Sequence, residues 1–133
     1  MKFSTSVIAL GAAAAVSGAA VQLAKRFVGD GTWYNVSVGY GACGTLQGDH
    51  EYVVAVSDRR YEETKVDGNP NNNKICGRLI SIDGESANGP VTARVVDRCG
   101  GCKYDDIDMS PALFQHVVGD LGLGRRQINW HFI

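Results

Sequence analysis

Two aspartates are the residues of this sequence best placed to do chemistry. Asp97 ends a β-branched run that begins at Val91, and Asp108 stands between apolar Ile107 and Met109. A carboxylate in apolar surroundings is partly desolvated, which raises its pKa and strengthens the hydrogen bonds that it forms. Such a group can bind a polar ligand or, when protonated, act as a general acid.

Both aspartates also have structural roles open to them. Asp108 comes just before a predicted helix and could cap it or hydrogen-bond within the fold. Asp97 could pair with Arg98 or accept from turn amides. We favour a ligand-binding role for Asp108 and leave both roles open for Asp97.

The N-terminal residues have the pattern of a secretory signal peptide. A lysine at the second position is followed by an apolar run over 7–16 and small residues over 17–20, so residues 1–20 are predicted to be removed. The apolar run is shorter than the roughly 20 residues that a membrane-spanning helix needs. Lys25-Arg26 matches a dibasic processing site, so residues 21–26 are either a pro-segment or a frayed end.

Residues 27–133 have the length of one domain with its own core. Ten basic residues face 14 acidic ones there, a net charge of −4, because three of the 13 basic residues precede residue 27. This charge argues against a nucleic-acid or anionic-membrane partner. We expect a secreted, extracellular monomer.

Four cysteines lie in this part of the chain, and an even number in a small exported domain is typical of two disulfides. Three pairings are open, of which we favour Cys43 with Cys76 and Cys99 with Cys102. The Cys-Gly-Gly-Cys spacing also occurs in redox and metal sites, but the sequence holds one such pair and no histidines at zinc spacing. We therefore expect no metal and no cofactor.

Short β-branched segments separated by glycine, asparagine and aspartate predict strands joined by turns. One helix is predicted over 110–118, because Ser110 suits the N-cap and Pro111 the first helical position. The polar stretch 67–74 is rich in residues that tolerate positive φ, which predicts a loop. Strands are predicted over 32–38, 52–56, 78–82, 91–96 and 127–133.

Motifs in a fixed order carry a resemblance to the double-psi β-barrel of expansin-like proteins over essentially all of residues 27–133. It implies a mainly β fold, a six-stranded double-psi β-barrel with one or two short helices. This superfamily includes expansins, fungal loosenins, barwin-like defence proteins, lytic transglycosylases of the rare-lipoprotein-A type and secreted papain inhibitors, so the fold does not decide the function. The motifs are Gly31-Thr32-Trp33-Tyr34, Gly41-Ala42-Cys43-Gly44, Asn69-Pro70 with Cys76-Gly77, Val95 to Cys102, Ile107 to Phe114, and Trp130.

Four residues match the polysaccharide-binding groove of the expansin barrel. Thr32 and Tyr34 match its groove-lining threonine and tyrosine, and Asp97 and Asp108 match its two groove aspartates. Successive side chains of a strand alternate in direction. We therefore expect Tyr34 in the groove and Trp33 in the core or on the barrel flank.

The resemblance implies a protein without catalytic residues. Inverting hydrolysis pairs an acid with a second carboxylate about 6.5 to 9.5 Å away, and related hydrolases place that base after a Thr-x-Tyr motif, where this chain has Asn35-Val36-Ser37. Related transglycosylases pair an aspartate in the Asp97 position with a histidine near the second strand. His50, His116 and His131 are instead expected at the surface or in packing roles.

The expected partner is a cell-wall polysaccharide such as cellulose or chitin, which the protein would bind and loosen without hydrolysis. The alternative is an inhibitor of papain-like cysteine proteases, acting through exposed loops such as 57–73 and independent of Asp108. A hydrolase or lytic transglycosylase is a further alternative, and a defence-eliciting or chitin-binding effector would share the groove. Asn35-Val36-Ser37 is also an N-glycosylation sequon, and whether Asn35 carries a glycan stays open.

Overall fold

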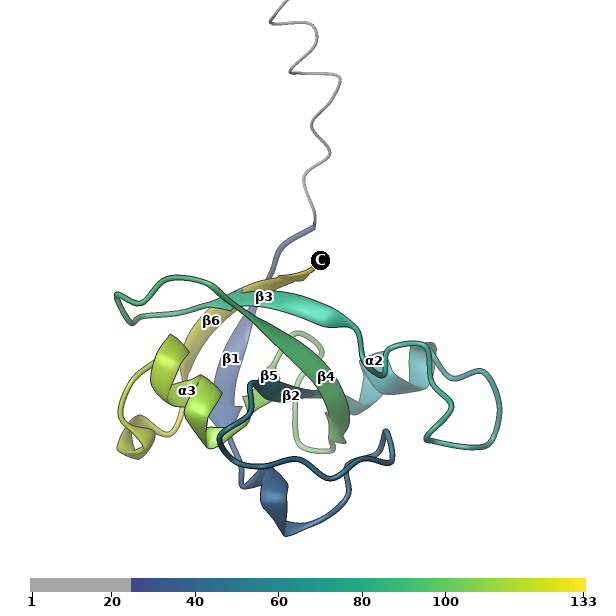
Figure 1. Cartoon of the computed structure of the whole chain (residues 1–133). Coiled ribbons are helices and arrows are strands. Elements are labelled where there is room, and N and C mark those ends of the chain that lie inside the picture. Colours follow the sequence, from purple (N-terminus) through teal and green to yellow (C-terminus); the bar gives the residue numbers. More distant parts are fainter. Residues whose placement is uncertain (1–24) are drawn as a thin grey trace, which may run out of the picture.

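A computed structural model describes residues 25–133, which form a closed six-stranded barrel (Figure 1). The predicted mainly β fold class is confirmed. The predicted signal peptide and most of residues 21–26 lie outside the described residues. The strands are β1 (Phe27–Trp33), β2 (Val53–Ser57), β3 (Leu79–Asp83), β4 (Val91–Cys99), β5 (Ile107–Met109) and β6 (Arg126–Phe132).

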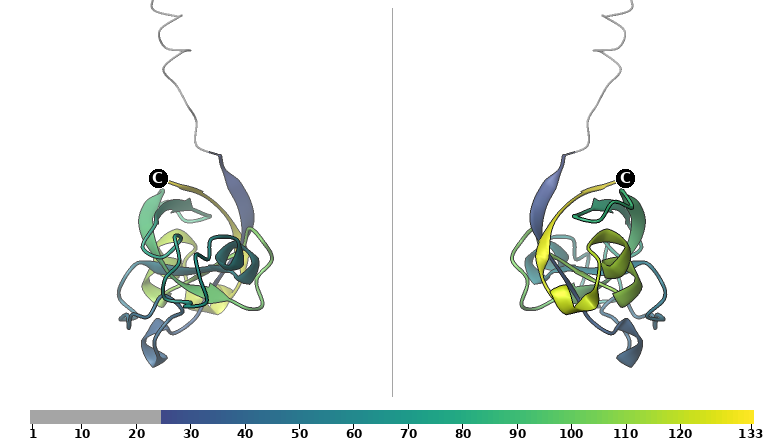
Figure 2. Two further views of the ribbon diagram at one scale, coloured as in Figure 1. Left: turned by 90° about the vertical axis from the view of Figure 1, so that its right-hand side faces the viewer. Right: turned by 90° about the vertical axis from the view of Figure 1, so that its left-hand side faces the viewer.

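The strands follow one another around the barrel in the order β1-β5-β2-β4-β3-β6. The pairs β1–β5 and β2–β4 are parallel, and the other four pairs are antiparallel. Figure 2 shows β1 and β6 side by side, where Phe27 pairs with Trp130 and the C-terminus lies beside the start of β1. Closure leaves no free sheet edge between the first and last strands.

Within residues 25–133, two α-helices and two 3-10 helices connect the strands: α2 (Asp58–Glu63), α3 (Pro111–Val117), η2 (Val36–Val38) and η3 (Leu121–Leu123). Helix α3 begins as predicted, because Ser110 accepts a hydrogen bond from the Leu113 amide and Pro111 occupies the first turn. Among residues 25–133, no helix is long and apolar enough to cross a membrane.

The barrel interior holds one apolar core. Its largest fully buried side chains include Trp130, Tyr61 and Phe114. Phe27 packs on Trp130 with ring centroids 4.7 Å apart, and the Arg60 guanidinium lies 4.1 Å from the centroid of the Phe27 ring. These contacts anchor the first residue of β1, directly after the Lys25-Arg26 pair.

The sequence predictions were wrong in three places. The strand predicted over 32–38 ends at Trp33, because the Asp49 carboxylate accepts hydrogen bonds from the Asn35 and Ser37 side chains and turns the chain into η2. Residues 57–73 are not all loop, since α2 lies within them and buries Tyr61. Strand β5, which the sequence analysis did not predict, has only three residues.

Two disulfides cross-link the barrel. Cys43 is bonded to Cys76 and Cys99 to Cys102, which are the pairs favoured from the sequence, and the described residues contain no free cysteine. The first bond joins residues 33 apart, whereas the second joins residues only three apart. The chain entropy that a cross-link removes from the unfolded state grows with the closed loop.

The two disulfides are therefore expected to stabilise the fold unequally. Replacing Cys43 and Cys76 by serine should lower the free energy of unfolding by about 4 kcal/mol, and replacing Cys99 and Cys102 by about 2 kcal/mol, on the chain-entropy estimate. Guanidinium unfolding of the two double variants beside wild type measures both losses. An equal loss, or a larger one from the short loop, contradicts the expectation.

Candidate functional site

Three of the four candidate residues lie in one row across neighbouring strands. The strand register pairs Thr32 with Asp108, Asp108 with Ala55, and Ala55 with Asp97. Paired residues present their side chains on the same face of a sheet, and the Thr32 hydroxyl donates to Asp108 Oδ1 over 2.8 Å. Two strand spacings separate the aspartates, which places their Cα atoms about 9 to 10 Å apart, with Ala55 at the register position between them.

The row faces outward because the neighbouring residues face the core. Ile107 and Met109 are fully buried in the barrel core, so the side chain of Asp108 between them points to the outer face. Asp97 reaches the same face through a β-bulge. The register of β2 with β4 shifts between Val54 and Ala55, so that Val96 is an extra residue and reverses the direction of Asp97.

Tyr34 completes the site from the end of β1. Its hydroxyl donates to Asp97 Oδ2 over 3.1 Å, so its side chain reaches from β1 to β4. Burial, together with the carboxylates of Asp97 and Asp108, raises the pKa of the Tyr34 hydroxyl, which therefore stays protonated at neutral pH and remains a donor. We call Thr32, Tyr34, Asp97 and Asp108 the polar row; Trp33 packs against the barrel core, as expected.

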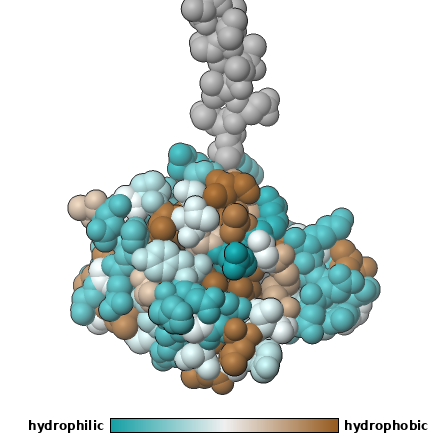
Figure 3. All heavy atoms as spheres, viewed as in Figure 1, coloured by the Kyte–Doolittle hydropathy of each residue, from teal (hydrophilic) through white to brown (hydrophobic). Residues whose placement is uncertain are grey.

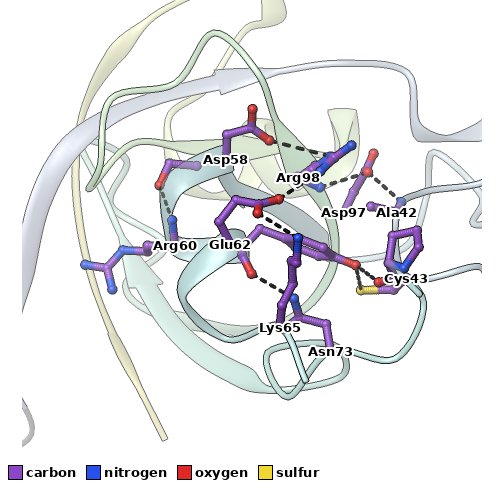
Figure 4. A network of polar contacts seen from close by, with 12 residues as sticks. Ala42, Cys43, Asp58, Arg60, Glu62, Lys65, Asn73, Asp97 and Arg98 are labelled. Atoms are coloured by element: carbon purple, nitrogen blue, oxygen red, sulfur yellow. Dashed lines mark hydrogen bonds and ion pairs between the residues drawn. The ribbon is translucent and has the colours of Figure 1, made fainter. Parts of the chain in front are cut away.

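Asp97 is held by backbone amides on its other oxygen. Oδ1 accepts from the Ala42 amide over 2.7 Å and from the Arg98 amide over 2.8 Å (Figure 4). The Arg98 guanidinium does not pair with Asp97 but with Asp58 and Glu62 of α2, over 3.5 and 3.4 Å. Of the structural roles considered above, Asp97 thus accepts turn amides, and it also joins the polar row.

Asp108 has the more ligand-like environment. Its one hydrogen-bond partner in the described residues is the Thr32 hydroxyl, and Ser110 rather than Asp108 caps α3. Burial raises the pKa of the Asp108 carboxyl, the Thr32 hydroxyl opposes that rise, and the neighbouring charge of Asp97 adds to it. A partly desolvated carboxylate with a free oxygen can accept hydrogen bonds from a bound ligand.

Sequence reasoning missed Asp49, which contacts the segment that follows Tyr34. It accepts hydrogen bonds from Asn35 Nδ2, from Ser37 Oγ and from the Ser37 amide, at 2.9 to 3.1 Å. Burial acts to raise the pKa of Asp49, but these hydrogen bonds outweigh it and lower that pKa. No local pattern in the sequence marks Asp49, since its partners lie at least 12 residues away.

A hollow of about 300 Å³ adjoins the row at Val96, the residue before Asp97, and is lined among others by Thr45, Gln47 and Arg94. It extends the outer face along the segment that follows η2. Sequence reasoning gave no signal for this hollow, because its walls come from three distant segments.

The remaining candidates for catalysis or metal binding lie elsewhere. His116 Nδ1 is 3.1 Å from the Tyr52 hydroxyl, His50 is exposed, and His131 lies on β6, which is not adjacent to β5. Within the part of the chain that the structure describes, no group of three or more histidine, cysteine, aspartate or glutamate side chains could hold a metal ion.

The strand order, the two short helices and the outward polar row define a double-psi β-barrel of the expansin and barwin type. Residues 23–132 match the Barwin family, and the chain belongs to it.

Two kinds of relative stand out among known proteins. A papain inhibitor from Streptomyces mobaraensis is 29% identical over 123 residues, which cover 91% of this chain and 81% of the relative. The solved structure of a Streptomyces papain inhibitor is 31% identical with a TM-score of 0.68, over 82% of this chain and 94% of that one. An expansin from Clavibacter michiganensis, solved in complex with cellohexaose, is 24% identical with a TM-score of 0.65, over 82% of this chain and 50% of that one, and shares the fold.

The raised pKa of Asp108 gives a test of this geometry. Because the folded state disfavours the ionised carboxylate, stability should fall as the pH rises from the ordinary value of 3.8 through the raised pKa. Asp108→Asn removes this loss. The melting temperature of the variant minus that of wild type should therefore increase between pH 3 and pH 7. Thr32→Val removes the hydroxyl that opposes the rise and should steepen the fall. Parallel curves of melting temperature against pH for all three proteins would contradict the assignment.

Proposed function

We propose that this protein is a secreted, extracellular, monomeric binder of cell-wall polysaccharide that holds the glycan at the polar row and loosens it without hydrolysis. The observation that carries this proposal is the outward row of Thr32, Asp108, Ala55 and Asp97 across neighbouring strands. Together with Tyr34, this row places two carboxylates and two hydroxyls, all half-buried, on the outer face of the sheet.

The chemistry of the row suits sugar hydroxyls. The free oxygen of Asp108 accepts from a hydroxyl, and a hydrogen bond to a charged group contributes about 1.5 to 3 kcal/mol. Tyr34, whose hydroxyl reaches Asp97, supplies a ring beside the carboxylates as well as a hydroxyl. A chain that hydrogen-bonds here competes with glycan–glycan contacts, which loosens a polymer network while its covalent bonds stay intact.

The proposal excludes turnover because the two carboxylates differ in their surroundings. Asp97 Oδ1 accepts two backbone amides and Oδ2 accepts the Tyr34 hydroxyl, so its oxygens are engaged in holding the protein. A general base must instead orient a water molecule on the sugar. Asp49, which contacts the segment after the Thr-x-Tyr motif where related hydrolases carry their base, is engaged in three hydrogen bonds.

Glycan binding should depend on Asp108. The Asp108→Ala variant is expected to bind about 10- to 100-fold more weakly than wild type, because it loses one charge-assisted hydrogen bond. Pull-down of the mature protein on cellulose, chitin, chitosan and peptidoglycan measures the affinity. Asp83→Ala on β3, across the barrel from β5, is the matched control and should bind like wild type.

A reducing-sugar assay on the same polysaccharides tests the absence of catalysis. Release of reducing sugar that is sustained in wild type and lost in Asp108→Asn would overturn the non-enzymatic reading. Wild-type binding by Asp108→Ala to every polysaccharide would overturn the polar row as the binding site.

A second candidate function is inhibition of papain-like cysteine proteases. It is supported by similarity to the sequence of a papain inhibitor and to the solved structure of a Streptomyces papain inhibitor, in each case over most of both chains. Such inhibition would use exposed loops and leave the Asp108 carboxylate unused.

Purified protein should then inhibit papain in stoichiometric titrations, and Asp108→Ala should inhibit as strongly as wild type. Papain activity that persists at a large molar excess of wild-type protein would remove this second function. A loss of inhibition in Asp108→Ala with unchanged melting temperature would show that both ligands use the polar row.

A further inference from the structure

Three large apolar side chains project from residues 38–46, which begin at the last residue of η2. Val38 is 86% exposed, Tyr40 76% and Leu46 52%. Val38 and Tyr40 are the two most exposed large apolar residues among residues 25–133. We call residues 38–46 the apolar loop. Single exposed apolar residues are common, whereas three within nine residues form a candidate contact surface.

A tight turn separates Tyr40 from Leu46. The Gly41 amide donates to the Thr45 carbonyl over 3.0 Å, and the Gly44 amide donates to the Gly41 carbonyl over 2.9 Å. Tyr40 and Leu46 directly precede and follow this hydrogen-bonded turn in the sequence, so each end of the turn carries an exposed apolar side chain. In Figure 1 this blue segment projects from the bottom of the barrel, and Figure 3 shows hydrophobic atoms at the same lower edge.

The apolar loop is fixed to the barrel at several points. The Cys43 amide donates to the Val96 carbonyl over 3.2 Å, and the Cys43–Cys76 disulfide ties the turn to a second segment. Asn71 donates from Nδ2 to the Ala42 carbonyl over 2.7 Å. A Cβ on Gly41 would lie 2.6 Å from the Val96 carbonyl oxygen, so the backbone of the turn packs directly against β4.

We propose that the apolar loop is the surface that enters the active-site cleft of a papain-like cysteine protease. This inference rests on the second proposed function. A projecting, convex and apolar surface fits a concave partner, and a cross-linked loop loses little conformational entropy on binding. Tyr40 supplies the type of anchor residue that most often carries binding energy in protein interfaces.

Other occupants fit this surface less well. Val38 and Leu46 offer no hydrogen bonds to sugar hydroxyls, and the net charge of −4 over residues 27–133 disfavours an anionic membrane. Residues 57–73, the loops expected above to contact a protease, contain the charged helix α2, and their most exposed large apolar residue, Val66, is 45% exposed. The apolar loop therefore replaces them as the inhibitory surface.

The test compares two triple variants as inhibitors of papain. Changing Val38, Tyr40 and Leu46 to serine should raise the inhibition constant by about 30-fold or more, the loss typical of removing an interface hot spot. The matched control changes Val28, Val66 and Leu123, three apolar residues exposed elsewhere, and should inhibit like wild type. Circular dichroism and melting temperature confirm the fold of both variants. If the loop variant fails to fold, the single change Tyr40→Lys, at an exposed side chain, is tested in the same assay. It should also raise the inhibition constant.

The outcomes separate the surface from the function. Unchanged inhibition by the folded loop variant, with wild type active, overturns the apolar loop and leaves protease inhibition standing. Absence of inhibition by wild type overturns both. A loop variant that loses cellulose or chitin binding but still inhibits papain overturns the proposal and makes the loop a glycan contact.

Discussion

The Asp97 carboxylate is the contact on which both candidate surfaces depend. Its two oxygens accept from the Ala42 amide, the Arg98 amide and the Tyr34 hydroxyl. One side chain thereby joins β4, the end of β1 and the turn of the apolar loop. Buried or half-buried donors that lose their acceptor destabilise the fold. Removal of the Asp97 carboxylate would leave the Tyr34 hydroxyl and the Ala42 amide without this acceptor at the same time.

The two aspartates of the polar row have different roles because their surroundings differ. Asp97 is satisfied by groups of the protein. Asp108 has a single partner among residues 25–133, the Thr32 hydroxyl, and partial burial disfavours its charged form. A carboxylate that is desolvated and under-bonded in the free protein gains more from a ligand donor than one already satisfied. An aspartate therefore stabilises the fold at position 97 and is free to bind a ligand at position 108, two strands away.

The features that could be predicted from the sequence are those determined by residues close together in the chain. Helix α3 begins where Ser110 and Pro111 indicated, and Asp108 faces outward because apolar Ile107 and Met109 flank it. The direction of Asp97 could not be predicted by alternation, since regular pairing would turn it toward the core with Val95. The bulge at Val96 depends on the register between β2 and β4, which local sequence does not encode. Asp49 and the apolar loop escaped prediction for the same reason, because distant contacts rather than propensity end β1 at Trp33.

The two proposed functions use separate residues on one scaffold. The barrel core and its strand pairing hold the polar row, while the disulfide and the Asp97 hydrogen bonds hold the apolar loop next to it. Neither Asp108 nor Tyr40 takes part in the apolar core, so either can change without altering the barrel. Members of such a family can thus gain or lose a glycan or a protease partner while the fold is kept. In this chain the apolar loop begins five residues after the last strand residue of β1, so its partner would lie close to any glycan bound at the polar row, and the two ligands would compete through steric overlap rather than through a shared contact.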